Sequence, residues 1–294
     1  MTETMTIGMV GLGRMGAGMA KRLRDAGHDV IGYDRNPNVS DVESLEEMVE
    51  QLPSPRIVWM MVPSGEITET AIRDVANLLE PGDILVDGGN SYVKDTVRRA
   101  TELSERELRF LDVGTSGGVS GLENGFCLMA GGDPEVFAAV EPVLAALAPA
   151  DGYARVGGPG AGHFTKMVHN GVEYGMLQAY AEGFDLLHAA AEYDFDLHQI
   201  AALWNQSSVV RSWLLELAEN AFEKDSELEG LKAYVDDSGE GRWTVLEAVE
   251  RGVNVGVLSQ SLFARFSSRE DNAFSMRVIA ALRNEFGGHA VKST

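Results

Sequence analysis

One segment in the second half of the chain gathers side chains that can exchange protons. Lys166, His169, Asn170 and Glu173 lie close together in a stretch without proline. In a helix they occupy positions i, i+3, i+4 and i+7, so all four project from one face. Polar groups on such a face need solvent, partners or a ligand, because burying them unpaired costs free energy. The segment is therefore either a reactive surface or a solvent-exposed face with a Lys–Glu ion pair.

A second segment, near the start of the chain, has the spacing of a phosphate-binding loop. Gly11, Gly13 and Gly16 follow a predicted strand and open a predicted helix. The first glycine permits the tight turn, the second lets the backbone approach a pyrophosphate, and the third packs helix on strand. Free N–H groups at the helix start favour the phosphates. The predicted cofactor-binding residues of this loop are Gly11, Leu12, Gly13, Arg14, Met15 and Gly16.

The residue that ends the next predicted strand bears on the choice of cofactor. The Asp34 carboxylate can accept hydrogen bonds from both ribose hydroxyls of NAD, and it would repel the 2′-phosphate of NADP. Arg35 leaves an alternative open, because a guanidinium there could stack on adenine or pair with that phosphate. We therefore predict NAD as the cofactor, with Arg35 either a cofactor contact or a surface residue.

The elements that position these segments differ between the two halves of the chain. Apolar runs at 6–10, 29–34, 56–62, 84–87, 109–113 and 126–130 alternate with amphipathic stretches. This alternation predicts an α/β fold, a Rossmann-like, doubly wound domain over residues 1–160. From residue 161 to about 193 the pattern is that of one long interdomain helix, and only helical patterns follow. Residues 161–294 are therefore predicted to form an all-helical domain.

Two glycine-containing segments follow predicted strands of the first domain. The run Asp87-Gly88-Gly89-Asn90-Ser91 comes at the carboxyl end of a strand, where open α/β sheets bind ligands. The run Thr115-Ser116-Gly117-Gly118 follows the next strand and offers backbone N–H groups and a hydroxyl, which suits a carboxylate. Each segment by itself could also be a plain turn.

Taken together, residues 11–16, 87–91, 116–118 and 166–174 resemble the decarboxylating 6-phosphogluconate dehydrogenase family, in its short-chain form. The glycine-rich loop, the Ser-Gly-Gly and the lysine are shared with the wider β-hydroxyacid dehydrogenase superfamily. The pattern Lys-x-x-His-Asn-Gly-x-Glu-Tyr, together with Gly-Gly-Asn-Ser, is similar to the phosphogluconate branch in particular. The resemblance covers essentially the whole chain.

The resemblance implies a role for each matching residue. Lys166 would be the general base and Glu173 the general acid, and Val62 and Asn90 would join the cofactor site. One position departs from the family pattern: no lysine precedes Trp243-Thr244, and Arg242 is the candidate replacement. The implied substrate-binding residues are Asn90, Ser116, Gly117, Gly118, His169, Asn170, Tyr174, Arg265, Arg283 and His289.

The implied reaction converts 6-phosphogluconate to ribulose 5-phosphate and CO₂ with reduction of NAD, a step of the pentose phosphate pathway. A neutral lysine would take the hydroxyl proton, and the protonated amine would then stabilise charge as CO₂ leaves the β-keto acid. A carboxylic acid would protonate the resulting enediol, so the reaction requires no metal. The resemblance also implies a homodimer or a dimer of dimers, in which Arg283 and His289 reach the partner's site.

Two other functions remain open from the sequence. One is a non-decarboxylating dehydrogenase of the same superfamily, acting on a small 3-hydroxy acid. In such an enzyme Arg265, Arg283 and His289 would have less purpose, because no phosphate needs them. The other is a dinucleotide-binding redox sensor without chemistry, which gives no purpose to Lys166 and Glu173.

Composition excludes several other classes of protein. With a net charge of −21 over 294 residues, nucleic acid and anionic membrane surfaces are poor partners. The apolar runs are too short to span a bilayer, and the acidic start of the chain is unlike a secretion signal, so we expect a cytoplasmic protein. The single cysteine, Cys127, excludes a disulfide framework within one chain and is expected to be buried. No metal site is predicted.

Overall fold

The computed structural model describes residues 4–287, 290 and 292. The chain divides into two compact units, Met1–Val168 and His169–Thr294, and each is described by itself. The first is a doubly wound α/β unit and the second is helical, which confirms the predicted fold class. The boundary after residue 160 stays a prediction, because the long helix begins at Ala161 whereas the units separate further along, inside that helix.

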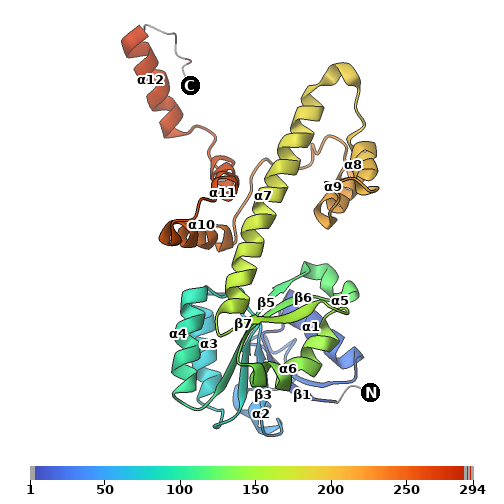
Figure 1. Ribbon diagram of the computed structural model, residues 1–294, viewed down its shortest axis with the longest axis vertical. Helices are drawn as coiled ribbons and strands as arrows, with labels where there is room; N and C mark the ends of the chain where they lie inside the picture. Colours follow the sequence, from blue (N-terminus) through green and yellow to red (C-terminus); the bar gives the residue numbers. More distant parts are fainter. Residues whose placement is uncertain (1–3, 288–289, 291, 293–294) are drawn as a thin grey trace. The chain divides into compact units, whose positions relative to one another are not determined.

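The first unit is built on a sheet with the strand order β2-β1-β3-β4-β5-β6-β7 (Figure 1). Neighbouring strands are parallel except β5 and β6, which are antiparallel. Because β2 and β3 lie on either side of β1, the winding direction reverses between β1 and β3. The strands are β1 (Thr6–Val10), β2 (Asp29–Tyr33), β3 (Ile57–Met60), β4 (Ile84–Asp87), β5 (Arg109–Ser116), β6 (Cys127–Gly132) and β7 (Tyr153–Gly157).

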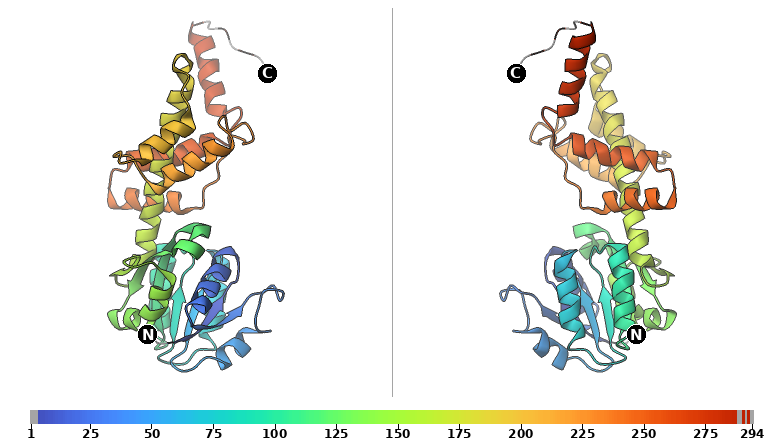
Figure 2. Two further views of the ribbon diagram at one scale, coloured as in Figure 1. Left: turned by 90° about the vertical axis from the view of Figure 1, so that its right-hand side faces the viewer. Right: turned by 90° about the vertical axis from the view of Figure 1, so that its left-hand side faces the viewer.

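Helices cover both faces of this sheet because its strands are apolar on both faces. Trp59 packs in one buried cluster with residues of α1 and α6, whereas Val58 and Met60 pack in another with residues of α2, α3 and α4. Figure 2 shows α1 on one face and α3 and α4 on the other. The helices are α1 (Arg14–Asp25), α2 (Leu45–Glu50), α3 (Glu66–Ala76), α4 (Val93–Ser104), α5 (Gly121–Asn124) and α6 (Pro134–Leu147).

The structure departs from the predicted elements at three places in this unit. Strand β5 continues through Ser116, so Thr115 and Ser116 belong to the strand and do not follow it. Strand β7 was not predicted, because three of its five residues are exposed and show no apolar pattern. The prediction that Cys127 is buried is wrong: it begins β6, opposite Ser116, and is exposed.

The second unit contains helices only among its described residues. Its core is small, with Phe184, Ala201, Leu215 and Phe222 buried together, and the rings of Phe184 and Phe222 lie 4.9 Å apart between centroids. The last helix reaches Gly287, beyond the predicted end at residue 284. The helices are α7 (Ala161–Ala189, which begins in the first unit), α8 (Leu197–Asn205), α9 (Trp213–Lys224), α10 (Glu240–Arg251), α11 (Gly256–Ser267) and α12 (Phe274–Gly287).

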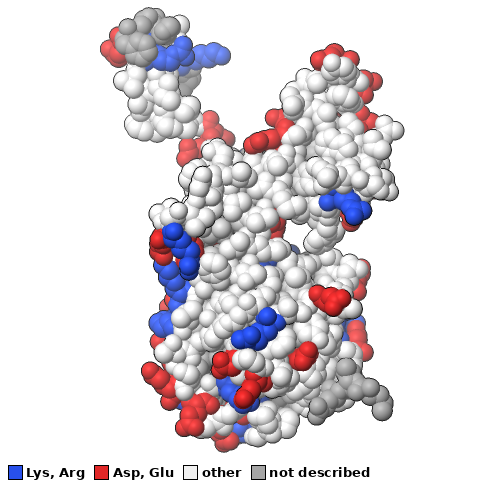
Figure 3. Space-filling model, viewed as in Figure 1, with Lys and Arg blue, Asp and Glu red and all other residues white. Residues whose placement is uncertain are grey.

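Charge is spread over the surface and is not gathered in one basic patch on the face in view. Figure 3 shows acidic side chains over this face of the first unit, with basic side chains among them. None of the described helices combines the length and the apolar character needed to cross a membrane. Within the same residues, no group of three or more His, Cys, Asp or Glu side chains is placed to hold a metal ion.

Candidate active site

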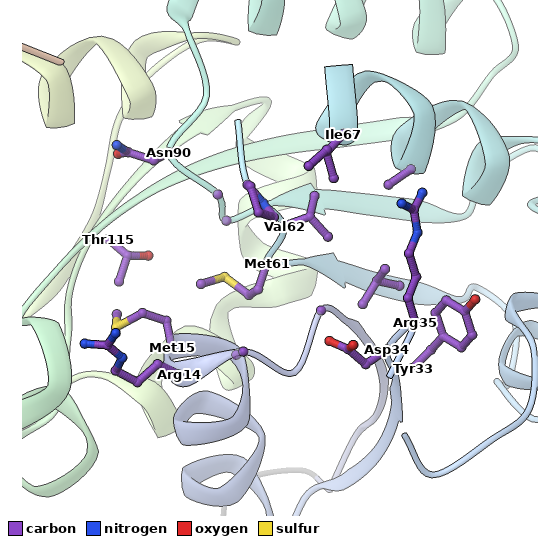
Figure 4. Close-up of a pocket in the computed structure, with 18 of the residues that line it drawn as sticks. Arg14, Met15, Tyr33, Asp34, Arg35, Met61, Val62, Ile67, Asn90 and Thr115 are labelled. Carbon is purple, nitrogen blue, oxygen red and sulfur yellow. The ribbon is translucent and has the colours of Figure 1, made fainter. Parts of the chain in front are cut away.

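The first unit contains a cavity of about 720 Å³ at the carboxyl ends of β1 to β4. It opens where the winding of the sheet reverses, between β1 and β3, which is where doubly wound sheets bind ligands. Asp34 and Arg35 lie at one end of this cavity, Asn90 and Thr115 at the other, and Met61 between them (Figure 4). The cavity is therefore long enough to separate two different ends of a ligand.

Each glycine of the phosphate-loop motif has a steric reason to be there. Gly11 has a φ of +94°, and a Cβ on it would lie 2.4 Å from the Met61 carbonyl oxygen. A Cβ on Gly16 would lie 2.0 Å from the Gly11 carbonyl oxygen, so α1 packs directly against the turn. Gly13, which precedes α1, faces open space and lines the cavity. A pyrophosphate can therefore approach the backbone at Gly13, at the positive end of α1.

The Asp34 carboxylate is held by backbone N–H groups. Its Oδ2 accepts the N–H of Leu12 at 2.7 Å and its Oδ1 accepts the N–H of Asn36 at 2.8 Å. Leu12 thus contributes its backbone, while its side chain packs near Gly32 and does not line the cavity. Arg14, Met15 and Gly16 line the cavity as well, and Arg35 lines it while remaining exposed.

At the other end of the cavity, Asn90 sits on a loop that a buried carboxylate holds in place. Asp87 accepts the N–H of Gly89 at 3.1 Å and the hydroxyl of Ser91 at 2.7 Å. The buried Arg99 lies 3.8 Å from the same carboxylate and donates to Glu69 at 2.8 Å. Hydrogen bonds from Arg98 and Arg99 lower the pKa of Glu69 to about 2. The loop that carries Asn90 is therefore fixed to α3 and α4.

The sequence did not single out Thr115 as a cofactor-binding residue, although it lines the cavity beside Asn90. Its hydroxyl oxygen is buried and has no hydrogen-bond partner among the described residues. The residue was grouped with Ser116 as part of one turn, but neighbouring residues of a strand point to opposite faces. The strand alternation is the signal that separates them. Val62, which was predicted, lines the cavity too.

Ser116, Gly117 and Gly118 lie just outside this cavity, where β5 ends. Gly117 has a φ of +118° and Gly118 a φ of +53°, so the chain turns here in a conformation that other residues rarely adopt. None of the three is among the residues that line the cavity. Their predicted role in binding the substrate stays a prediction.

In the second unit, two predicted substrate-binding residues lie together. Tyr174 of α7 is buried, and its hydroxyl accepts the N–H of Ser238 at 3.1 Å. The Arg265 guanidinium lies over the Tyr174 ring, 3.4 Å from its centroid, and donates to the Asp236 carbonyl at 3.0 Å. His169 and Asn170 are joined by a hydrogen bond of 3.0 Å between Nδ1 and Oδ1. Lys166 lies in the part of α7 that belongs to the first unit.

Two family models together match nearly the entire chain. The NAD binding domain of 6-phosphogluconate dehydrogenase matches residues 6–157, and the 6-phosphogluconate dehydrogenase C-terminal domain matches residues 162–293. The chain belongs to the 6-phosphogluconate dehydrogenase family. It is therefore an oxidoreductase with an NAD(P)-binding domain.

Relatives of this 6-phosphogluconate dehydrogenase family member agree with that assignment, and two of them match over nearly their whole length. The NAD⁺-dependent, decarboxylating 6-phosphogluconate dehydrogenase of Haloferax volcanii is 43% identical over 98% of this chain and 98% of its own length. YqeC of Bacillus subtilis is 44% identical over 98% of this chain and 99% of its own length. The NADP⁺-dependent enzyme of Bacillus subtilis is 37% identical, and this chain spans 61% of its length.

Solved structures of two other proteins show the same fold. Plasmodium falciparum 6-phosphogluconate dehydrogenase matches with a TM-score of 0.83 and 25% identity, covering 98% of this chain and 66% of that chain. Mycobacterium tuberculosis 3-hydroxyisobutyrate dehydrogenase matches with a TM-score of 0.74 and 23% identity, covering 96% of this chain and all of its own. The second likeness concerns the fold alone.

The position at which this family member lacks a lysine has an unexpected arrangement. Arg242 donates to the Asp237 carboxylate at 2.7 and 3.0 Å, and Arg269 donates to it at 2.7 Å. These hydrogen bonds, Arg242 first, lower the pKa of Asp237. Sequence reasoning gave no role to Asp237, and it missed Arg269, which lies 32 residues away in the sequence. That Arg242 replaces the missing lysine stays a prediction.

The remaining predicted residues lie toward the end of the chain. Arg283 is exposed on α12. His289 lies outside the described residues.

Proposed function

We propose that this protein catalyses the oxidative decarboxylation of 6-phospho-D-gluconate to ribulose 5-phosphate and CO₂, with NAD as the oxidant. The observation that carries the proposal is the full-length identity of 43% with a relative named for that NAD-dependent, decarboxylating reaction. The fixed Asp34 carboxylate and the Lys-x-x-His-Asn-x-x-Glu face of α7 support it.

The residues of the cavity fit a dinucleotide at both ends. Gly11, Gly13 and Gly16 would hold the pyrophosphate, and Asp34 would hold the adenosine ribose. Asn90 and Thr115 would contact the nicotinamide end, where Thr115 has a buried hydroxyl to offer. NAD, when bound there, supplies a hydride acceptor.

The proposed proton transfers belong to two residues of α7. Lys166 takes the proton of the substrate hydroxyl as the alcohol is oxidised, and its ammonium then donates to the new carbonyl oxygen while CO₂ leaves. Glu173 protonates the carbon of the resulting enediol. The His169–Asn170 hydrogen bond fixes both side chains, which would present a defined edge to the sugar hydroxyls. Tyr174 and Arg265 would bind the phosphate end.

A second candidate is a dehydrogenase that oxidises a small 3-hydroxy acid without decarboxylation. It is supported by the complete coverage of the 3-hydroxyisobutyrate dehydrogenase chain by this chain, although that likeness shows only the fold. The two candidates differ in their substrate and in whether CO₂ is released.

Supplying purified protein with 6-phosphogluconate and NAD should release CO₂ and NADH in a ratio of one to one. Trapped ¹⁴CO₂ from substrate labelled at C1 and absorbance at 340 nm measure the two products. NADH without CO₂, or turnover only with 3-hydroxyisobutyrate, would favour the second candidate. If neither substrate is turned over, a dinucleotide-binding redox sensor without chemistry would be the remaining function of the three.

The choice of cofactor should depend on Asp34. Wild-type protein should have a higher kcat/KM with NAD than with NADP, and Asp34→Asn should narrow that ratio about tenfold by removing a like-charge repulsion. Asp41→Asn is the matched control, because Asp41 also accepts a backbone N–H, at 2.8 Å from Gly32, but does not line the cavity. A wild-type preference for NADP would show that Arg35 decides the cofactor instead.

We propose that the enzyme works in the cytoplasm, because its charged substrate and cofactor are both present there and do not cross membranes unaided.

We also propose that the protein is a homodimer. Several large apolar side chains of the second unit are at least 71% exposed, which is costly unless something covers them. A second copy of the chain would cover them. These side chains are Leu186, Val209, Leu231, Val249, Val257 and Phe274.

A further inference from the structure

A buried carboxylate on β5 binds the start of the helix that carries Lys166. Asp112 is fully buried, and its Oδ1 accepts the N–H of Gly160 at 2.7 Å while its Oδ2 accepts the N–H of His163 at 2.8 Å. The first N–H groups of a helix have no partner within the helix, so these two need an acceptor from elsewhere. Asp112 supplies it from a strand far away in the sequence.

Glycines allow this first turn of α7 to lie directly on the sheet. A Cβ on Gly162 would lie 2.4 Å from the Met129 carbonyl oxygen and 2.5 Å from that of Asp112. A Cβ on Gly131 of β6 would lie 2.5 Å from the Gly162 nitrogen. The turn therefore has no room to shift toward β5 or β6, and its hydrogen bonds to Asp112 hold it from moving away.

Lys166 follows this turn immediately and crosses the same strand. A Cβ on Gly114 would lie 2.4 Å from Cβ of Lys166, so the lysine side chain starts directly over β5 at Gly114. Asp112, Gly114 and Ser116 alternate along β5 and share one face of it. Asp112, which binds the first turn, is thus only two residues along β5 from Gly114, where the lysine side chain begins.

A residue of α4 holds the same turn from a second side. The His163 ring nitrogen Nδ1 lies 2.8 Å from the hydroxyl of Thr96 on α4, and both residues are buried. Asp112 pairs in register with Asp87, the residue that fixes the Asn90 loop. Burial raises the pKa of Asp112, whereas His163 and the two N–H groups oppose that rise. Neighbouring carboxylates on β4 and β5 therefore fix Asn90 and the first turn of α7.

We propose that Asp112 is a positioning residue for Lys166. By holding the first turn of α7 on β5, it determines the rotation and height of the helix at Lys166, and hence where the amine reaches. Asp112 itself is fully buried and does not line the cavity. The inference rests on the proposed role of Lys166 as the base.

The direct test is Asp112→Asn, which keeps the size of the side chain. The amide oxygen of asparagine can accept the N–H of only one of the two residues, Gly160 or His163. The NH₂ group then faces the N–H of the other residue, and because two donors repel each other the turn must tilt. We expect kcat to fall about tenfold to a hundredfold, as displacement of a reacting group by about 1 Å does. KM for 6-phosphogluconate and the Kd of NAD should change less than threefold, because the turn binds neither.

The matched control is Asp83→Asn in the same unit. Asp83 is also buried and accepts two backbone N–H groups, those of Arg56 at 2.7 Å and Glu80 at 2.9 Å. It also accepts the Arg56 guanidinium at 3.1 Å, and none of these hydrogen bonds involves α7. It should lower Tm as Asp112→Asn does while leaving kcat within twofold of the wild-type value. An equal loss of kcat in both variants would show that buried carboxylates in this unit act only on stability.

The decisive measurement combines Asp112→Asn, and separately Asp83→Asn, with Lys166→Met in one chain. The residual rate of NADH formation of each double variant is then measured over long incubations. If Asp112 acts through Lys166, Asp112→Asn should reduce the residual rate less than twofold in that background. The same factor of loss with and without Lys166 would overturn the proposal. If Asp112→Asn does not fold, Thr96→Val takes its place in this comparison, because it replaces the hydroxyl beside His163 with a methyl group. The expected loss of kcat is then smaller. If Lys166→Met keeps more than about a tenth of the wild-type rate, Lys166 is not the base, and that part of the proposed function fails separately from this inference.

Discussion

Replacing Lys166 with methionine should leave only a small residual rate of NADH formation from 6-phosphogluconate, while the Kd of NAD stays unchanged. Methionine keeps most of the length of the side chain but cannot accept a proton, so the oxidation step loses its base. General base catalysis contributes about 10²–10⁴-fold, and kcat should fall by that factor. Because the amine acts mainly in the transition state, kcat/KM should fall with kcat, and KM should change little. Steady-state absorbance at 340 nm measures both constants.

The control for this prediction is Lys224→Met, which removes an exposed lysine at the end of α9. It should leave both constants within twofold of wild type. A Lys166→Met enzyme that keeps more than about a tenth of the wild-type rate would exclude Lys166 as the base. The base would then have to be sought elsewhere on the same helix.

The fold could be predicted where burial leaves a pattern in the sequence. Every residue of β3 and β4 is buried, so both strands stand out as apolar runs. Strand β7 lies at the edge of the sheet with three exposed residues, and its sequence carries no such run. Cys127 was expected to be buried because apolar residues follow it, but the first residue of a strand at the rim can face solvent.

The site could be predicted where its residues are neighbours in the sequence. The glycine loop and the face of α7 are local motifs, and their spacing predicts what they bind. Asp112 and Thr115 owe their proposed roles to strand pairing and packing, which no local motif records. One signal was available: Asp87 and Asp112 each interrupt or end a buried apolar run, where a charge is costly unless something needs it.

The last helix, α12, presents exposed apolar side chains along its length. Phe274, Val278 and Leu282 recur every four residues along α12, and all three are exposed. An apolar stripe of this kind needs a covering surface, and Arg283 follows it directly. If a partner chain covers the stripe, Arg283 is carried to that partner, where its planar guanidinium suits a phosphate. This is the arrangement that the resemblance to 6-phosphogluconate dehydrogenases implies.

Mixing two inactive variants, Lys166→Met and Arg283→Ala, should therefore restore activity when subunits exchange. In a heterodimer, one site combines the intact Lys166 of one chain with the intact Arg283 of the other. Random exchange of equal amounts in a two-fold symmetric dimer should return about a quarter of the wild-type rate. Native mass spectrometry of chains with different tags establishes that exchange has occurred, and NADH formation at 340 nm gives the rate.

The matched control replaces the Arg283→Ala chain with one that also carries Lys166→Met. Its heterodimers form through the same surface, but no site in them contains a lysine, so no activity should return. This comparison separates shared sites from stabilisation of one inactive chain by another, because dimer formation is the same in both mixtures. If the first mixture stays inactive although heterodimers are present, Arg283 serves its own chain or does not contact the phosphate. The exposed apolar stripe of α12 would then serve only to join the two chains, and Arg283 would not be part of the partner's substrate site.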